Sequence, residues 1–234
     1  MKNETLDRNF NEEPLRGFIR LRLKAVLLLV VLSLFLGGCA TNRGVLDLNV
    51  PATSSAVNPN GKTVYINSVK DNRVFEERPA TPDVPSLGLG GSANSSESLK
   101  KRAIARKRNS YGKALGDILL PENKTVETVV ADSLALSLSE LGYTVIKNRS
   151  DITNETVIID ASIGKFWSWM NPGFWAITLT SEIETDLSVL SPDLEKKEIQ
   201  VRSQGNYQVA NTKNWREIMM LSLEKYKEEV KTSF

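Results

Sequence analysis

Residues 175–189 read WAITLTSEIETDLSV, and apolar and polar side chains alternate along most of this stretch. One face carries the apolar side chains Trp175, Ile177, Leu179, Ile183, Leu187 and Val189. The other face carries Thr178, Thr180, Glu182, Glu184 and Asp186. A period of two is typical of a β-strand that buries one face. The sequence therefore predicts a long strand with one face in the core and one in water.

The flanking segments repeat this pattern. Residues 156–166 place Val157, Ile159, Ala161 and Ile163 on one face, and residues 199–209 place Ile199, Val201, Tyr207 and Val209 on one face. Turn signals rich in proline, glycine and aspartate separate the three segments. Three long strands with short turns and one wet face predict an antiparallel meander. Residues 63–69 predict a further strand, with Val64 and Ile66 on one side.

Two segments have the apolar spacing of amphipathic helices. In residues 125–141 the stripe is Val126, Val129, Val130, Leu134, Leu138 and Leu141; in residues 214–231 it is Trp215, Ile218, Met219, Ser222 and Tyr226. Thr125 suits an N-cap and Gly142 a C-cap. The predicted fold class is α+β: an antiparallel sheet of about four to five strands with two main helices packed on one face, a two-layer sandwich.

The amino-terminal segment has the three parts of a bacterial export signal. A basic region over residues 16–24 precedes 12 mostly apolar residues, 25–36, and then the small residues Gly37 and Gly38 before Cys39. The apolar run is shorter than the roughly 20 residues that cross a membrane as a helix. A buried core helix is the other alternative, and it would need burial on every side because nine of the 12 residues are Leu or Val.

The segment Leu36-Gly37-Gly38-Cys39 resembles the lipobox of bacterial lipoproteins. The resemblance implies that residues 1–38 are a signal peptide and that Cys39 becomes the lipidated first residue, anchored in a membrane. Ala40 is not aspartate, which in that group implies sorting to the outer membrane of a Gram-negative cell, facing the periplasm. Residues 39–61, with Pro51, Pro59 and Gly61, are then interpreted as a lipidated tether, in which residues 45–50 could add a short edge strand. Residues 62–234 are interpreted as a periplasmic domain.

Composition excludes most catalytic chemistry. The chain has no histidine and one cysteine, so Ser-His and Cys-His nucleophiles, imidazole bases and thiolate or imidazole metal sites are absent. No cofactor, metal or catalytic residue is predicted, and the protein is expected not to be an enzyme. Without residues 1–38 the chain carries 24 basic and 24 acidic side chains, so it is not expected to bind nucleic acid.

Residues 77–98 are rich in Pro, Gly and Ser, and basic residues are dense between positions 100 and 113. Together they are interpreted as an irregular basic insertion at about 77–120. Candidate partner-binding residues here are Lys101, Arg102, Arg106 and Arg108. They could meet lipid head groups, lipopolysaccharide or an acidic partner. The favoured alternative is a solvated helical face. The Gly112-Lys113 pair lacks the preceding glycine and following Ser or Thr of a phosphate-binding loop.

Two further features lie on the predicted sheet. Residues 166–175, FWSWMNPGFW, place five aromatic residues around one hairpin tip. The candidates Trp167, Trp169, Phe174 and Trp175 form either an exposed patch for a partner or membrane, or an end-cap of the core; Trp167 and Trp169 are the two expected to be exposed. The carboxylates Glu182, Glu184 and Asp186 are interpreted as a solvated face rather than a hard-cation site. The basic segment could lie over them.

The order of these elements resembles the YajG-like family of uncharacterised bacterial lipoproteins. The resemblance rests on the lipobox, the strand at 63–69 followed by Asp71-Asn72-Arg73, the helix ending at Gly142-Tyr143, the meander and the terminal helix. It implies an outer-membrane-anchored α+β domain without catalytic residues. The expected function is a non-enzymatic lipoprotein that docks an envelope protein or lipid. The alternative is an accessory or carrier in lipid or lipopolysaccharide transport, with a cleft between sheet and helices.

Overall fold

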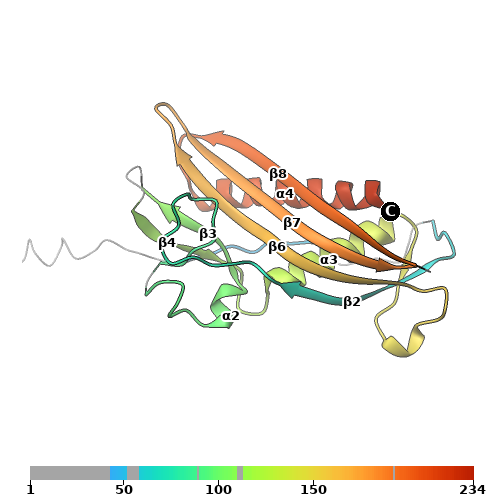
Figure 1. Ribbon diagram of the computed structural model, residues 1–234. Helices are drawn as coiled ribbons and strands as arrows, with labels where there is room; N and C mark the ends of the chain where they lie inside the picture. The colour runs from blue at the N-terminus through green and yellow to red at the C-terminus, as the bar shows by residue number, and fades with distance from the viewer. Residues whose placement is uncertain (1–42, 52–57, 89, 110–112, 192) are drawn as a thin grey trace, which may run out of the picture. The chain divides into compact units, whose positions relative to one another are not determined.

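The computed structural model describes residues 43–51, 58–88, 90–109, 113–191 and 193–234 (Figure 1). The chain divides into two units, residues 1–40 and residues 41–234, and all described residues belong to the second. The predicted signal peptide, the lipobox residues Leu36, Gly37 and Gly38, and Cys39 lie outside the described residues.

One sheet of eight strands runs through the described part of the chain. The strands are β1 (Gly44–Val45), β2 (Thr63–Asp71), β3 (Ala103–Arg108), β4 (Ala114–Leu119), β5 (Thr144–Val145), β6 (Val157–Pro172), β7 (Ile177–Leu190) and β8 (Leu194–Tyr207). The central strand is β6, which pairs along its length with β7. Its other edge is shared by β2 and β3, one after the other (Figure 1). Outside these lie β5, β4 and β1.

The sheet is mixed, so the prediction of an antiparallel sheet with four to five strands is wrong. Four strand pairs are parallel, namely β1–β4, β2–β5, β2–β6 and β3–β6. Three are antiparallel, namely β3–β4 and the two pairs of the β6–β7–β8 meander. Alternation along a strand indicates which face is buried but not which strand lies beside it. The class remains α+β.

Two long helices cover one face of the sheet (Figure 1). They are α3 (Val126–Glu140) and α4 (Thr212–Ser233). Helix α3 begins with a capping box in which Thr125 Oγ1 accepts a hydrogen bond from the backbone N–H of Thr128 at 3.3 Å. Side chains from both helices and the sheet form the main core. Within this core, Thr185 Oγ1 lies 2.9 Å from the Tyr226 hydroxyl. Burial raises the pKa of Tyr226.

The two-layer description fails at one end of the sheet. A third helix, α2 (Glu97–Lys100), and the loop before it lie on the opposite face. There a second apolar cluster forms from Leu87, Ala103, Leu119, Trp167 and Trp169, with Phe75 and Leu99 packed against it. A short 3₁₀ helix, η1 (Arg149–Asp151), follows β5.

A β-bulge at Gly164 explains this second cluster. Pairing of β6 with β7 shifts by one residue between Ile163 and Lys165. An extra residue reverses the side-chain alternation beyond the bulge. As a result Phe166 joins the main core, whereas Trp167 points to the opposite face. The Trp167 indole N–H donates to the carbonyl of Pro82 at 3.2 Å.

The interpretation of residues 77–120 as an irregular insertion is wrong for its second half. Residues 103–108 and 114–119 are strands β3 and β4 of the main sheet, and Ala103, Ile104 and Ala105 are fully buried. The segment is rich in proline and glycine only before α2, where the backbone is irregular.

The interpretation of residues 39–61 as a tether is also wrong in part. Strand β1 lies parallel to β4, with Gly44 opposite Ile118. Leu46 and Leu48, which follow β1, are fully buried in the main core. Residues 43–48 are therefore part of the folded domain. Among the described residues, none of the helices is both long enough and apolar enough to span a membrane.

Candidate functional site: the open face of the sheet

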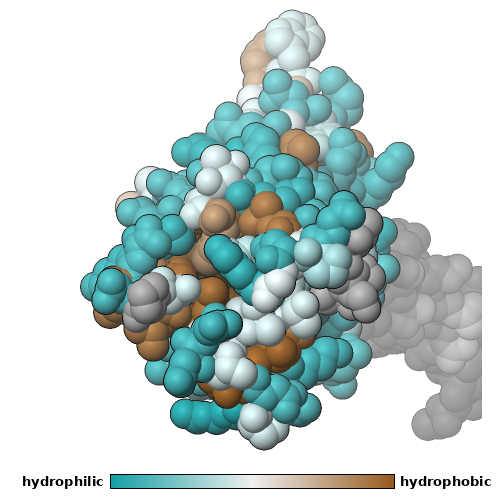
Figure 2. All heavy atoms as spheres, turned by 90° about the vertical axis from the view of Figure 1, so that its right-hand side faces the viewer, coloured by the Kyte–Doolittle hydropathy of each residue, from teal (hydrophilic) through white to brown (hydrophobic). Residues whose placement is uncertain are grey.

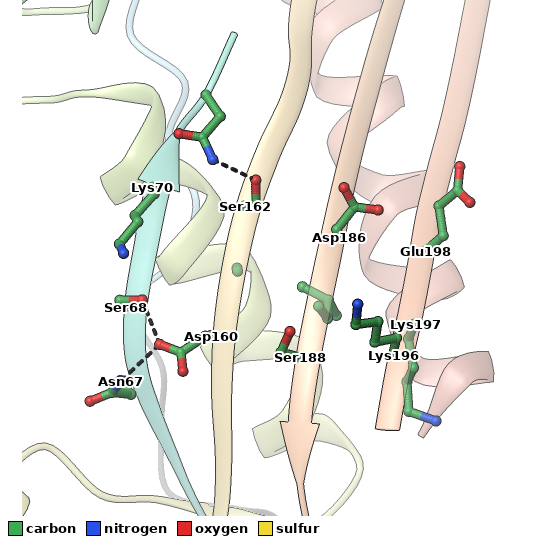
Figure 3. Close-up of a pocket in the computed structure, with 13 residues that line it drawn as sticks. Asn67, Ser68, Lys70, Asp160, Ser162, Asp186, Ser188, Lys196, Lys197 and Glu198 are labelled. Carbon is green, nitrogen blue, oxygen red and sulfur yellow. Dashed lines mark hydrogen bonds between the residues drawn. The ribbon is translucent and has the colours of Figure 1, made fainter. Parts of the chain in front are cut away.

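A broad polar hollow crosses β2, β6, β7 and β8 on the face opposite α3 and α4 (Figure 3). We call it the open face; its volume is about 1030 Å³. It is lined by Asn67, Ser68, Lys70, Asn72, Asp160, Ser162, Asp186, Ser188, Lys196, Lys197 and Glu198, with Ala161 and Leu187 beneath. On β6 and β7 the polar residues face this hollow because alternate positions of a strand face away from the core. The adjacent Asn67 and Ser68 both line it because the pairing of β2 with β6 shifts between Ile66 and Ser68.

Side chains of β2 and β6 are tied together across the open face (Figure 3). The Asp160 carboxylate accepts hydrogen bonds from the Asn67 amide, at 2.8 Å, and from the Ser68 hydroxyl. The Asn72 amide donates to Ser162 Oγ at 2.8 Å. These bonds hold one side of the hollow in a fixed arrangement.

The other side of the open face carries separate charges of both signs. Asp186 on β7 stands directly opposite Glu198 on β8, and Ser188 stands opposite Lys196. Like charges on facing positions repel each other, so this region favours a ligand that brings cations to the acidic pair. Among the described residues, no group of three or more Asp, Glu, His or Cys side chains is placed to hold a metal ion.

The carboxylates Glu182 and Glu184 have partners within the sheet. Lys165 Nζ lies 2.9 Å from Glu182 and 3.7 Å from Glu184, and the Gln200 amide donates to Glu184 at 2.9 Å. The ammonium of Lys165 occupies the place where a bound cation would neutralise them. The basic segment 100–113 is therefore not the partner of these carboxylates. Their partner is Lys165 of β6.

Lys165→Met is expected to lower the free energy of unfolding at neutral pH by about 1 kcal/mol. Burial alone would lower the pKa of Lys165, but the hydrogen bond and charge of Glu182, with the charges of Glu184 and Asp83, raise it above 10.5. A raised lysine pKa stabilises the fold below the unfolded-state value, and that contribution disappears as the pH rises through the folded-state value. Urea unfolding should therefore show a gap between wild type and variant that is constant near neutrality and closes above pH 10.5. An exposed control, Lys62→Met, should show no gap; a gap that persists at high pH would contradict the assignment.

The four candidate basic residues make contacts within the domain. Lys101 forms an ion pair with Glu127 at 3.0 Å, and Arg102 Nε donates to the carbonyl of Leu120 at 3.0 Å. On the other side of β3, a guanidinium N–H of Arg106 donates to Ser86 Oγ at 3.0 Å, and one of Arg108 does so at 3.4 Å. Burial and the charge of Arg106 lower the pKa of Arg108. The four cations therefore do not form a single patch.

The aromatic hairpin divides into a buried and an exposed pair. Trp167 and Trp169 are 0% and 4% exposed, so the expectation that they would be exposed is wrong. The Arg202 guanidinium lies 5.3 Å from the ring centre of Trp169 and covers it. Phe174 and Trp175, at the tip, are 87% and 83% exposed, with ring centres 4.7 Å apart and planes at 87°. Trp167 and Trp169 are therefore part of the core, as in the end-cap alternative, whereas Phe174 and Trp175 are exposed, as in the other alternative.

Sequence analysis missed the buried ion pairs. Asp117 is fully buried; its carboxylate accepts the backbone N–H of Gly88 at 2.9 Å and meets Arg43 Nε at 3.4 Å. Its position before the apolar run 118–120 was the available signal. Arg73 is also buried and belongs to the polar stretch after β2.

No family model matches the sequence, and no curated protein matches it. Several solved structures are similar to this chain at low identity. An uncharacterised protein has a TM-score of 0.43 at 11% identity, covering 82% of this chain and 95% of its own. Protein XCC0632 from Xanthomonas campestris, of the DUF330 family, has a TM-score of 0.42 at 11% identity, covering 81% and 93%. A minor lipoprotein from Acinetobacter baumannii has 0.31 at 9% identity, covering 47% and 88%. These neighbours are uncharacterised bacterial proteins and a lipoprotein, and at these scores the likeness establishes neither family nor function.

Proposed function

We propose that this protein is a non-enzymatic lipoprotein of the bacterial envelope, anchored in the outer membrane by lipid on Cys39. Its domain is held close to that membrane and offers the open face to a periplasmic protein. The resemblance to the YajG-like family, which rests on the order of sequence elements, agrees with this proposal.

The observation that carries the proposal is the short arm between Cys39 and the folded domain. Only residues 40–42 separate Cys39 from Arg43, whose side chain pairs with the buried Asp117. Four residue steps span at most about 14 Å. A lipid on Cys39 would therefore hold the domain against the membrane surface, which suits a docking protein with a fixed position.

The open face supports docking of a protein rather than carriage of a lipid. It presents amides, hydroxyls and charges of both signs, which suit a polar protein interface. A lipid carrier would need an apolar cleft between sheet and helices. That space is filled by large side chains, among them Phe166, Trp215 and Tyr226, none of which is more than 1% exposed.

The anchor is tested by mass spectrometry of the full chain extracted from separated inner and outer membranes, beside Cys39→Ser. We expect a triacylated terminus at Cys39 in the outer-membrane fraction, and loss of membrane attachment in the variant, because three acyl chains bind a bilayer stably and one does not. An Ala40→Asp variant should move to the inner membrane. An intact Met1 terminus in the membrane would overturn the proposal.

Docking is tested by placing a photoreactive amino acid at Ser188 of the open face in living cells. We expect a covalent adduct with another protein. The matched control places it at Glu224, an exposed position of α4 on the other side of the sheet. Adducts of equal yield at both positions would contradict a specific docking face, and lipid adducts at Ser188 would favour the carrier alternative.

A further inference from the structure

Several strand ends meet at one end of the domain, where the chain leaves toward Cys39. Pro172, Ile177 and Tyr207 are neighbours across β6, β7 and β8. Strand β3 runs parallel to β6, so its last residue, Arg108, and the first residue of β4, Ala114, lie toward the same end of the sheet. Gly44 lines a small cavity with Lys107 and Asn211. We call residues 43–45, 107–109, 113–116, 171–178 and 204–213 the anchor end.

Exposed apolar side chains gather at the anchor end. Of nine large apolar side chains exposed in the described part of the chain, five lie here: Val45, Leu115, Phe174, Trp175 and Val209. Phe174 and Trp175 are the most exposed of these side chains, and they lie on a tight turn in which the Gly173 N–H donates to the carbonyl of Ala176 at 2.9 Å. An aromatic pair on a short, hydrogen-bonded turn exposes apolar surface at a fixed place.

The exposed charge of the anchor end is mainly positive. Its residues include Lys107, Arg108, Lys113 and Lys213, and none of its residues is Asp or Glu. Arg43 also lies here, but it is paired with Asp117 at 3.4 Å. The carboxylate of Glu217, further along α4, is engaged with the Tyr207 hydroxyl, whose pKa is raised by burial and by that carboxylate. Cations around exposed aromatic and aliphatic side chains are the combination that binds anionic membrane surfaces.

The opposite end of the sheet is different. There the β7–β8 hairpin exposes Leu190 and Leu194, but Glu195 and Glu198 lie beside Lys196 and Lys197. Figure 2 views this end, where hydrophilic residues surround separate apolar patches. The two ends are joined by strands of 14 residues, which span about 45 Å. One membrane surface cannot contact both hairpin tips of an upright sheet.

We propose that the anchor end rests on the membrane that holds the lipid of Cys39, with Phe174 and Trp175 inserted at the level of the lipid head groups. This inference rests on the proposed lipid anchor. Five residue steps join Cys39 to Gly44, a reach of at most about 18 Å, so the lipid brings the bilayer to this end of the domain. Aromatic side chains are favoured at that depth of a membrane. Contact at two points, the lipid and the hairpin, fixes the orientation of the open face.

The fluorescence of Trp175 can test this membrane contact. The chain has four tryptophans, and Trp167, Trp169 and Trp215 are buried. The full-length lipidated protein is reconstituted into vesicles of phosphatidylethanolamine and phosphatidylglycerol, with and without bromine on the acyl chains. Brominated lipid should quench up to about a quarter of the emission, one tryptophan in four, and Trp175→Phe should abolish that quenching. The matched control, Trp175→Phe with Leu194→Trp, moves the reporter to the opposite hairpin and should be quenched by aqueous iodide but not by brominated lipid.

The outcomes separate the two proposals. A preparation whose mass shows no lipid on Cys39 would overturn the proposed function. A lipidated preparation in which Trp175 stays accessible to iodide and unquenched by bromine would overturn the membrane contact alone. A photoreactive residue at position 174 in cells should give lipid adducts; adducts with one protein instead would show that a protein covers the hairpin and would also overturn the membrane contact.

Discussion

Arg73→Ala is expected to lower the free energy of unfolding by about 3–5 kcal/mol, the cost of breaking a buried ion pair from one side. The Arg73 guanidinium is buried and binds both carboxylate oxygens of Asp71 at 2.7 Å. It also donates to the carbonyls of Lys100, Ala103 and Phe166 at 2.9, 2.6 and 2.9 Å. Removing it leaves a buried carboxylate and three carbonyl groups without their donor.

The position of these bonds explains why one residue matters so much. Strands β2 and β3 share a single edge of β6, and β2 ends at Asp71 while β3 begins at Ala103. Arg73 lies in the junction and bonds to the end of β2, the end of α2, the start of β3 and the middle of β6. The Phe75 ring lies 5.2 Å from the guanidinium carbon. We therefore expect the loss of Arg73 to loosen both strands at once.

Arg73→Lys tests whether the planar shape or the charge is required. One ammonium cannot bind a carboxylate with two parallel bonds and also reach three carbonyls, so we expect a loss of about 2 kcal/mol. Arg78→Ala, an exposed control in the following loop, should change stability by less than about 0.5 kcal/mol. Urea unfolding followed by tryptophan emission measures all three. Wild-type stability in Arg73→Lys would show that charge alone suffices and would contradict the geometric argument.

Alternation along the sequence predicted where the long strands lie and which faces they bury. Leu179, Ile183 and Leu187 of β7 are buried, as their spacing indicated. Alternation could not show that β6 takes β2 and β3 as parallel neighbours, because that pairing joins residues about 60 to 95 positions apart. Strands β1 and β5 have two residues each, so alternation could not show that β1 pairs with β4 or that β5 pairs with β2.

In the aromatic hairpin, one extra residue in β6 changes which face of the sheet the following side chains occupy. Trp167 and Trp169 share a face, as their spacing requires, but that face is set by the bulge at Gly164. A glycine within a strand is compatible with a bulge, yet nothing local predicts that residues 75–99 fold over the indoles. The alternation also predicts Trp175 on the buried face of a strand, and this is wrong: β7 begins at Ile177, and Trp175 lies in the turn before it, 83% exposed.

Leu46→Ala is expected to lower the free energy of unfolding by about 2–5 kcal/mol, the cost of a buried leucine truncated to alanine. The Leu46 side chain is fully buried, and its backbone N–H donates to the carbonyl of Leu119 at 2.8 Å. The neighbouring Val45 is 57% exposed, so Val45→Ala is the matched control and should cost less than about 0.5 kcal/mol. Equal, small losses in both variants would show that the arm contributes nothing to the core.

The same arm determines how firmly the domain is oriented on the membrane. In the double variant Leu46→Ala with Leu48→Ala, we expect residues 43–50 to detach before the rest of the sheet unfolds, because β1 pairs with β4 at only two positions. The chain from Cys39 would then be free as far as Asn60, whose backbone N–H donates to the carbonyl of Gly142 at 2.9 Å. Its reach would be at most about 75 Å instead of about 18 Å. Limited proteolysis should cut the arm while the meander stays intact. Lipid quenching of Trp175 should fall in this variant although Cys39 keeps its lipid. Undiminished quenching with a cleaved arm would mean that the hairpin holds the membrane without help from the arm.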